Sequence, residues 1–359
     1  MAIPFLENTS RKKRDQVLAV DLGTRMTKAV HLQRRGDELA LCGYALMDAP
    51  IFDRSISAEL LAEHLKTVAQ TLGAKTKMVS LTVGVNDALV RAVDLPHIPL
   101  DDMRMVLRNN SRHYLQQDMS NYVFDCHIIP TWQQLKGEAA GANSQQGLQK
   151  QRVLVAGVRK QFAEEMVDGI KSAGLVADQL VPSLLGPVNA FEFSQPEVFK
   201  SEAVALVDIG FKSSSICILD MGELVLNRVV NIGGDRFTIS LSESMNISYA
   251  EAEGIKVGMP SEVQPTLESI MSSLGRELRA SIDFYEHQHD RTVHRVFVTG
   301  GTSRSEIIMR LLQTELMVDC KTWDPSGALR MELSPEKSAE IEQVGAQLTV
   351  AIGTGVAAL

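Results

Sequence analysis

One pattern occurs twice in this chain, in VLAVDLGTRMTKAVHL (residues 17–32) and in VALVDIGFKSSSICIL (residues 204–219). Each copy is an apolar strand that ends in Asp-apolar-Gly, followed by a short polar turn and a second strand. The copies lie about half a chain apart, which indicates an internal repeat of a domain core. The repeat therefore predicts an α/β protein built from two related lobes.

The residue types at the turns suit a nucleotide. Glycine lets the backbone approach a phosphate closely, and a tight turn between strands points consecutive N–H groups at an anion. The carboxylates of Asp21 and Asp208 end the two repeated strands. Because Mg²⁺ binds through one or two carboxylates plus nucleotide phosphates, we expect both to hold Mg²⁺, largely through water, and to act as catalytic residues.

The candidate phosphate contacts are the small, hydroxyl and basic residues of the two hairpins. They are Gly23, Thr24, Thr27 and Lys28 in the first copy, and Gly210, Lys212, Ser213 and Ser214 in the second. Asp-x-Gly after a strand is also ordinary turn chemistry. For a single copy, an ordinary turn would be the preferred interpretation. Two copies instead favour a nucleotide held between two facing hairpins.

Two further segments add candidates for the nucleoside. VFVTGGTSRSEII (296–308) places Gly300 and Gly301 between a strand and a helix, where backbone can lie against a flat ring, although such a turn also serves packing. Glu253 and Lys256 lie three residues apart on one face of a predicted helix. They are either a solvated ion pair or contacts to a ribose.

Length and composition set limits on the class of protein. A chain of 359 residues exceeds one ordinary core and suits two lobes. The net charge of −8 argues against nucleic-acid binding. No apolar run approaches the roughly 20 residues that cross a bilayer, and the N-terminus lacks the order of a secretory signal. The four scattered cysteines indicate reduced thiols, so we expect a cytoplasmic protein.

The ends and connections carry weaker expectations. The basic run within residues 1–16 is either a solvated tail or a weak attraction to an anionic membrane surface. A helix is predicted over 57–72, and a final helix from about 340. Residues 131–151 lack periodicity and are expected to form a loop between paired strands.

Three short motifs resemble those of the actin, heat-shock-chaperone and sugar-kinase superfamily. They are Asp21-Leu22-Gly23 (first phosphate motif), Asp208-Ile209-Gly210 (second phosphate motif) and Thr299-Gly300-Gly301 (adenosine motif). Within that superfamily the chain most resembles the PilM family, FtsA-like proteins of type IV pilus assembly. The similarity extends nearly end to end and includes Lys28-Ala29-Val30, Leu95-Pro96, 153–175, Ile232-Gly233-Gly234-Asp235 and Ala252-Glu253-Gly254-Ile255-Lys256. The chain departs from it at Arg25-Met26, where small residues are usual, and at Thr302, where a third glycine is frequent.

The resemblance implies an actin-like ATPase (ribonuclease H-like) fold that binds ATP and Mg²⁺, with Gly233, Gly234 and Thr302 added to the nucleotide site. It also implies an FtsA/PilM-type inserted subdomain, called 1C. The implied divisions are a basic tail (1–16), subdomain 1A (17–80, completed by 175–192 and 340–359), 1C (81–174), 2A (193–232, completed by 295–339) and 2B (233–294).

The implied partner is a PilN-like bitopic membrane protein, whose short cytoplasmic N-terminal peptide docks in a groove between the first lobe and subdomain 1C. That groove would be lined by parts of 78–96 and by a helix over 100–117. Its candidate contacts are Arg104, Arg108, Asn109, Arg112 and Tyr114, which are otherwise ordinary solvated helix surface.

The function implied by the resemblance is an ATP-binding scaffold of the pilus assembly platform, recruited to the inner face of the inner membrane, with nucleotide state modulating partner binding. Other pilus assembly proteins are further expected partners, and self-association is left open. The alternatives are an FtsA-like or chaperone-type ATPase and a small-molecule kinase. Hydrolysis is expected to be slow or absent, with Asp178 or Gln179, placed on the connection between lobes, as candidates to position a water.

Overall fold

Each copy of the repeated sequence forms an antiparallel strand pair within a larger sheet in the computed structural model, which describes residues 14–52, 55–129, 150–258 and 261–359. The first sheet contains β1 (Gln16–Leu22), β2 (Met26–Arg35), β3 (Glu38–Asp48), β4 (Met78–Val83), β8 (Val176–Pro182) and β14 (Arg330–Met331). The second contains β9 (Ala203–Ile209), β10 (Ser214–Asp220), β11 (Glu223–Val230), β12 (Arg295–Thr299) and β13 (Asp319–Thr322).

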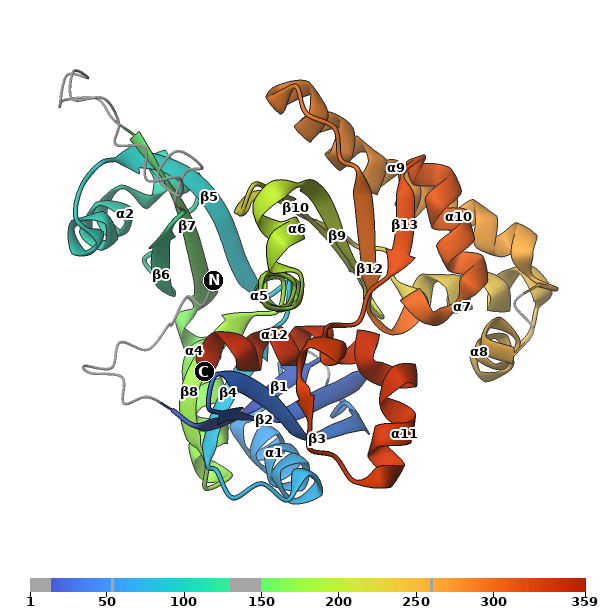
Figure 1. Ribbon diagram of the computed structural model, residues 1–359, viewed down its shortest axis with the longest axis horizontal. Coiled ribbons are helices and arrows are strands. Elements are labelled where there is room, and N and C mark those ends of the chain that lie inside the picture. The colour runs from blue at the N-terminus through green and yellow to red at the C-terminus, as the bar shows by residue number, and fades with distance from the viewer. Residues whose placement is uncertain (1–13, 53–54, 130–149, 259–260) are drawn as a thin grey trace.

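The two sheets share one strand order. It is β14-β3-β2-β1-β4-β8 in the first and β11-β10-β9-β12-β13 in the second, so that β3-β2-β1-β4 recurs as β11-β10-β9-β12. In both sheets the strand that carries the key aspartate pairs antiparallel with the next strand and parallel with a later one. The predicted duplication is therefore confirmed, and Figure 1 shows the two sheets as separate lobes.

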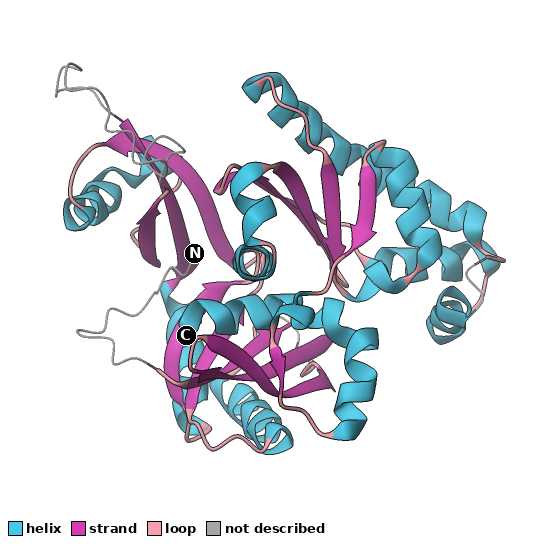
Figure 2. Cartoon of the chain, viewed as in Figure 1, coloured by secondary structure: helices cyan, strands magenta, loops and turns pink. Residues whose placement is uncertain are grey.

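Helices cover the sheets of both lobes (Figure 2). Those of the first lobe are α1 (Ala58–Leu72), α4 (Lys160–Ser172), α5 (Leu185–Ser194), α11 (Pro335–Val344) and α12 (Thr349–Ala358). Those of the second are α6 (Pro196–Ser201), which lies against β10, α7 (Gly234–Met245), α8 (Tyr249–Gly258), α9 (Gln264–His289) and α10 (Glu306–Leu316). Because β1 alternates its side chains, Leu18 and Val20 join one core and Val17 and Ala19 another on the opposite face.

The helix expected over 57–72 is capped at both ends. The Ser57 side chain accepts a hydrogen bond from the Leu60 N–H, and Gly73 ends the helix with φ of 59°. A hydroxyl at the N-cap satisfies one of the otherwise unpaired N–H groups, and glycine adopts the left-handed conformation without a steric penalty. This helix, α1, follows from its local sequence.

A third, smaller sheet stands beside the first lobe (Figure 1). It contains β5 (Ala88–Pro96), β7 (Lys150–Arg159) and β6 (Tyr122–Ile128) in that order, with α2 (Leu100–Leu115) packed on it. The antiparallel β6–β7 pair confirms that 131–151 connects paired strands, although 130–149 lie outside the described residues. Helix α4, placed in the predicted insert, packs mainly on α1 of the first lobe, where a Cβ on Gly169 would meet Leu61 Cδ2 at 2.7 Å, and it also contacts β6 and β7 of the small sheet.

The C-terminal part of the first lobe begins earlier than predicted. Strand β14 pairs with β3, and α11 starts at Pro335 rather than near 340. The single predicted final helix is also wrong, because a 3-10 turn over Gly345–Leu348 separates α11 from α12. Pro335 at the first helical turn after the Ser334 N-cap is the local signal that marks the earlier start.

Asp178 and Gln179 lie in strand β8 and not on a connection between lobes. The Asp178 carboxylate accepts a hydrogen bond from Ser80 Oγ and forms an ion pair with Arg14, which therefore does not belong to a free tail. The remaining tail residues, 1–13, lie outside the described part. Within the part of the chain that is described, no helix has the length and apolar character needed to cross a membrane.

Candidate functional site

Asp21 is fixed at the end of β1 by neighbours on both sides. Its Oδ1 accepts a hydrogen bond from Thr82 Oγ1 of β4 at 3.0 Å, and its Oδ2 pairs with Lys28 Nζ at 2.9 Å. Lys28 lies directly opposite Asp21 in the β1–β2 register. Burial alone would lower the pKa of Lys28, but the adjacent Asp21 carboxylate raises it. Lys28 therefore stays a cation beside the first carboxylate.

Asp208 is the matching carboxylate of the second lobe. Burial raises its pKa to about 6; the nearby Lys28 cation opposes this rise, and repulsion from Asp21 adds to it. The charges of Asp21 and Lys28 both act on Asp208, although the three side chains come from two lobes. The repeat predicted one aspartate from each lobe at the end of its strand, and their role toward a nucleotide stays a prediction.

The glycines of the turns lie where a side chain has no room. A Cβ on Gly23 would meet Met26 O at 2.5 Å and Lys28 Nζ at 2.7 Å. A Cβ on Gly300, whose φ is 93°, would meet Asp208 Oδ1 at 2.5 Å. Backbone thus approaches both the Lys28 ammonium and the Asp208 carboxylate, as a phosphate- and metal-binding site requires.

These features fit a magnesium nucleotide. Mg²⁺ takes oxygen ligands and few of them from protein, and Asp21 and Asp208 supply carboxylates from the two sides. Lys28 supplies a positive charge for phosphate. When bound, the metal would neutralise phosphate charge, while the chain's own residues would orient the nucleotide between the lobes.

Helix α7 begins on the second hairpin. The Gly234 N–H donates to Gly210 O at 2.9 Å, and the Asp235 N–H donates to Phe211 O at 2.8 Å. A Cβ on Gly233 would meet Phe211 O at 2.4 Å. The predicted residues Gly233 and Gly234 therefore lie against the second phosphate turn, which places the helix N-terminus, an anion-binding element, beside it.

Glu253 and Lys256 come together on α8, as their spacing predicted, with 2.7 Å between carboxylate and ammonium. The Thr238 hydroxyl of α7 donates to Glu253 Oε2, the oxygen that pairs with Lys256, and accepts from Lys256 Nζ. Burial would raise the pKa of Glu253, but hydrogen bonds from Lys256, Thr238 and Arg25 lower it. The carboxylate is thus held ionised at the edge of the second lobe.

Several predicted contacts have other partners. Thr27 Oγ1 is buried against His64 Nε2 at 2.7 Å, and Ser214 Oγ donates to Ile232 O at 2.7 Å. Lys212 Nζ pairs with Asp235 at 2.6 Å. These side chains hold the hairpins in place, so their role toward a nucleotide stays a prediction.

The other predicted residues lie as follows. Thr24 is exposed in the first turn, Ser213 O accepts the Gly210 N–H, and Gly301 and Thr302 belong to a 3-10 turn over Gly301–Arg304. Sequence reasoning missed Thr82, Thr238 and Phe211, which have no spacing signal of their own. Asp235 belongs to the motif Ile232-Gly233-Gly234-Asp235, but the sequence assigned it no role. Arg25 stands out in the sequence only because the family usually has a small residue there.

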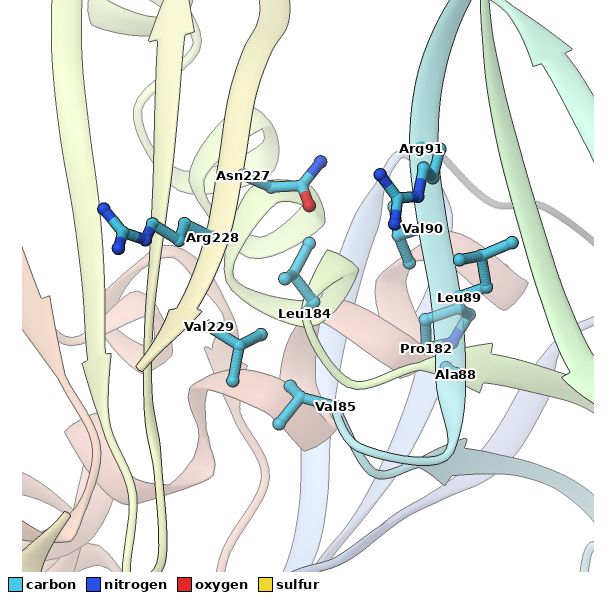
Figure 3. A pocket seen from close by; sticks show the side chains of 10 residues that line it. All are labelled: Val85, Ala88, Leu89, Val90, Arg91, Pro182, Leu184, Asn227, Arg228 and Val229. Atoms are coloured by element: carbon cyan, nitrogen blue, oxygen red, sulfur yellow. The ribbon is translucent and has the colours of Figure 1, made fainter. Parts of the chain in front are cut away.

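A pocket of about 260 Å³ opens where three parts of the chain meet. Its walls come from β5 of the small sheet, from the β8–α5 junction of the first lobe and from β11 of the second lobe. Figure 3 shows Val85 and Val229 pointing toward one another, with Arg91 and Asn227 facing across the same space. The full lining is Val85, Ala88, Leu89, Val90, Arg91, Pro182, Leu184, Asn227, Arg228 and Val229.

The five predicted peptide contacts on α2 do not line this pocket. Arg104 pairs with Asp101 and Asp125, and Arg112 pairs with Asp118. Arg108 lies over the Phe124 ring, Tyr114 packs edge-on against His113, and Asn109 is exposed. By contrast, the predicted segment 78–96 contributes Val85, Ala88, Leu89, Val90 and Arg91 to the pocket.

Solved structures of known proteins share this architecture. The PilM-PilN type IV pilus biogenesis complex matches with a TM-score of 0.78 and 21% identity, over 94% of this chain and 97% of that one. The ethanolamine utilization protein EutJ from Carboxydothermus hydrogenoformans matches with a TM-score of 0.54 and 15% identity, over 97% and 91%. MreB 5 of Spiroplasma citri, bound to AMPPNP, matches with a TM-score of 0.51 and 11% identity, over 96% of each chain. The predicted actin-like ATPase fold is therefore confirmed.

Sequence comparison gives the family. The cell division protein FtsA of Bacillus subtilis (strain 168) is 22% identical over 258 residues, which are 67% of this chain. The match spans only 57% of that relative's length. A family model described as type IV pilus assembly protein PilM matches residues 19–358. Because that model covers nearly the whole chain, this protein belongs to the PilM family of type IV pilus assembly proteins.

Proposed function

We propose that this protein is an ATP-binding scaffold of the type IV pilus assembly platform, in which nucleotide state changes the binding of a membrane partner. The nucleotide half of the proposal is supported by Asp21, which pairs with Lys28 in the first lobe, and by Asp208 at the matching strand end of the second lobe, where the charges of both residues act on it. The glycine turns that leave room for phosphate support it as well.

The partner half rests on the pocket shared by the three parts of the chain. Strands β5 and β11 each lie at an edge of their sheet, so each has backbone groups without a neighbouring strand on one side. An extended peptide suits such edges, with its side chains filling pockets between them. The volume of about 260 Å³ is below the range for drug-sized ligands and suits one or two peptide side chains.

The single observation that supports coupling between nucleotide binding and peptide binding is the position of this pocket. One wall comes from the second lobe (Asn227, Arg228 and Val229), whereas the opposite wall comes from the small sheet and the first lobe. Any rotation of the lobes that accompanies nucleotide binding changes the width of the pocket. Nucleotide and peptide therefore bias the same conformational equilibrium.

We assign the peptide to the cytoplasmic N-terminus of a PilN-like membrane protein. The family membership and the similarity to the solved PilM-PilN complex support this choice. Docking of such a peptide would recruit the protein to the inner face of the inner membrane. The FtsA-like alternative has weaker support, because that match covers a smaller part of both chains.

Slow or absent hydrolysis is part of the proposal. The Asp178 carboxylate already pairs with Arg14 and accepts from Ser80, so it is engaged elsewhere. Binding alone is enough for a switch, because a ligand shifts a conformational equilibrium by its difference in affinity for the two states.

The nucleotide site is tested by equilibrium binding of Mg-ATP to wild type, Asp21→Ala and Asp208→Ala. Each substitution should weaken binding at least tenfold, since each removes a charge that orders the metal. Thermal unfolding of each variant without ligand checks that the fold is intact. If both variants bind Mg-ATP as tightly as the wild type, the nucleotide site is elsewhere.

The peptide site is tested with a synthetic peptide that copies the PilN-like N-terminus. Val85→Asp should lower its affinity at least tenfold, because the carboxylate would be placed among apolar pocket walls. Arg112→Ala, an exposed change on α2, is the matched variant and should bind within about twofold of wild type. The opposite pattern would move the docking site to α2.

A further inference from the structure

Arg25 joins the two lobes through a contact that the nucleotide site does not require. It lies at the tip of the first hairpin, where the chain departs from the small residues usual in its family. Its Nη1 donates to Glu253 Oε1 at 2.8 Å, and the two residues are 228 positions apart in sequence. The contact therefore links the first phosphate turn to helix α8 of the second lobe.

Both partners of this contact are held in place by other groups. The Arg25 guanidinium also lies over the Phe211 ring of the second hairpin, 5.2 Å from its centroid, as in a cation–π contact. The Arg25 carbonyl oxygen accepts the Ala49 N–H at 2.9 Å. Glu253 is held from its other oxygen by Thr238 and Lys256. Prior anchoring lowers the entropy cost that makes most surface ion pairs weak.

The Arg25–Glu253 contact lies nearer to solvent than the carboxylate of Asp21. Along the first hairpin the exposed fraction of the side chain rises from 7% at Asp21 to 21% at Lys28 and 43% at Arg25. A ligand that approaches Asp21 between the two hairpin tips would pass the point where Arg25 meets Phe211 and Glu253. Opening this point requires the ion pair and the cation–π contact to break together.

We propose that Arg25 and Glu253 form a latch between the lobes that sets the rate of nucleotide exchange. The inference rests on the proposed nucleotide binding and adds a control of its kinetics. A latch that closes the route is a barrier to entry and exit alike. Its removal therefore raises both rate constants and changes the equilibrium affinity less than either rate.

The chain offers a matched control in Arg35 and Glu332. This ion pair measures 2.9 Å, with side-chain exposures of 41% and 26% against 43% and 19% for Arg25 and Glu253. Both of its partners belong to the first lobe, on β2 and just after β14, so it does not join the lobes. Loss of this pair should leave exchange within about twofold of wild type.

The test measures association and dissociation of a fluorescent ATP analogue with Mg²⁺ by stopped flow. Arg25→Ala should raise both rate constants about 3- to 20-fold, from loss of a half-exposed ion pair and a cation–π contact. Arg25→Lys keeps the charge and should fall between wild type and Arg25→Ala. At about 1 M salt the difference between wild type and Arg25→Ala should narrow, because the ion pair is screened.

Three results would overturn the latch. If Arg25→Ala and Arg35→Ala had equal association and dissociation rates, the Arg25–Glu253 contact would not limit access to the nucleotide site. A faster dissociation with unchanged association would make Arg25 a direct nucleotide ligand instead. If Arg25→Lys exchanged nucleotide as fast as Arg25→Ala, the ion pair with Glu253 would not explain the slower exchange of the wild type. Absence of saturable binding by the wild type would instead reject the proposed nucleotide site, and the latch with it.

Discussion

At the scale of single residues, Asp208 has the environment that most affects measurable behaviour. Its carboxylate is half-buried, and the loss of surrounding water disfavours the charged form and raises its pKa to about 6. Between the pKa of an unfolded aspartate and this value, the folded state binds the proton more tightly than the unfolded state. The stability that this group contributes is therefore complete below about pH 4 and is lost as pH rises through 6.

Asp208→Asn removes that titration in the metal-free protein. At pH 8 the variant should be more stable than the wild type, by up to about 3 kcal/mol from the difference between the two pKa values. The two proteins should converge as pH falls toward 4.5, because the wild-type carboxyl becomes neutral. Urea unfolding with a metal chelator from pH 4.5 to 8 measures this. A difference that stays constant over the range would contradict the burial of Asp208.

A side chain at Gly300 should clash with its surroundings, whereas one at the neighbouring Gly301 should not. Its φ of 93° and the 2.5 Å from a Cβ to both Asp208 Oδ1 and Ile209 O leave no room for a side chain. Gly300→Ala should lower the free energy of unfolding by about 2–4 kcal/mol. Gly301→Ala should change it by less than about 1 kcal/mol, since the added Cβ would lie 3.8 Å from its nearest neighbour, Gln347 Oε1. Equal stabilities, measured by urea unfolding, would show that the turn relaxes freely.

At the scale of elements, helices α5 and α12 cross unusually closely behind the first sheet. A Cβ on Gly186 would meet Val350 Cα at 2.8 Å, and one on Gly353 would approach the Gly186 carbonyl oxygen closer still. Glycine on both helices lets the backbones approach each other. The crossing fixes α12 against β1 and β2, which carry Asp21 and Lys28.

Gly353→Ala should therefore destabilise the whole first lobe. The added methyl group meets backbone, which cannot rotate away, so we expect a loss of about 3 kcal/mol or more. Gly327→Ala serves as the control, because nothing lies within 4 Å of a Cβ there and its φ is not in the left-handed region. The midpoint of urea unfolding is the measurement. A midpoint of Gly353→Ala equal to that of the control would mean that the helices separate without cost.

At the scale of the whole molecule, the lobes touch at both ends of the predicted nucleotide site. Arg25 meets Glu253 on one side. On the other, the Gly300 N–H donates to Ala346 O, and Thr299 Oγ1 donates to Ala346 O. The peptide pocket shares walls with both lobes. Under the proposed function, nucleotide, lobe closure and peptide would be connected through one rigid-body movement.

Such a connection is reciprocal by thermodynamic necessity. If Mg-ATP tightens binding of the PilN-like peptide by a given factor, saturating peptide should tighten Mg-ATP by the same factor, and we expect about 5-fold or more. Calorimetric titrations in both orders measure the two factors. Factors of one in both orders would show that the pocket does not respond to nucleotide, with each binding site left intact.

Local patterns predicted the elements and the pair of aspartates. The repeat of strand, Asp-apolar-Gly and strand was enough for the two lobes, because side-chain alternation and turn glycines act over a few residues. Ser57 and Gly73 gave α1 for the same reason. Ser334 and Pro335 mark the start of α11 locally, whereas the sequence predicted a final helix only from about 340.

What the sequence by itself determined is therefore the duplicated fold, the placement of Asp21 and Asp208 at strand ends, and the glycines beside them. The tertiary structure decided which charges meet. Arg25 pairs with Glu253, and the pocket is lined by residues 85, 88–91, 182, 184 and 227–229. These contacts depend on how the lobes pack and on the angle between them, and no periodicity within a short segment encodes a partner so far away in the chain.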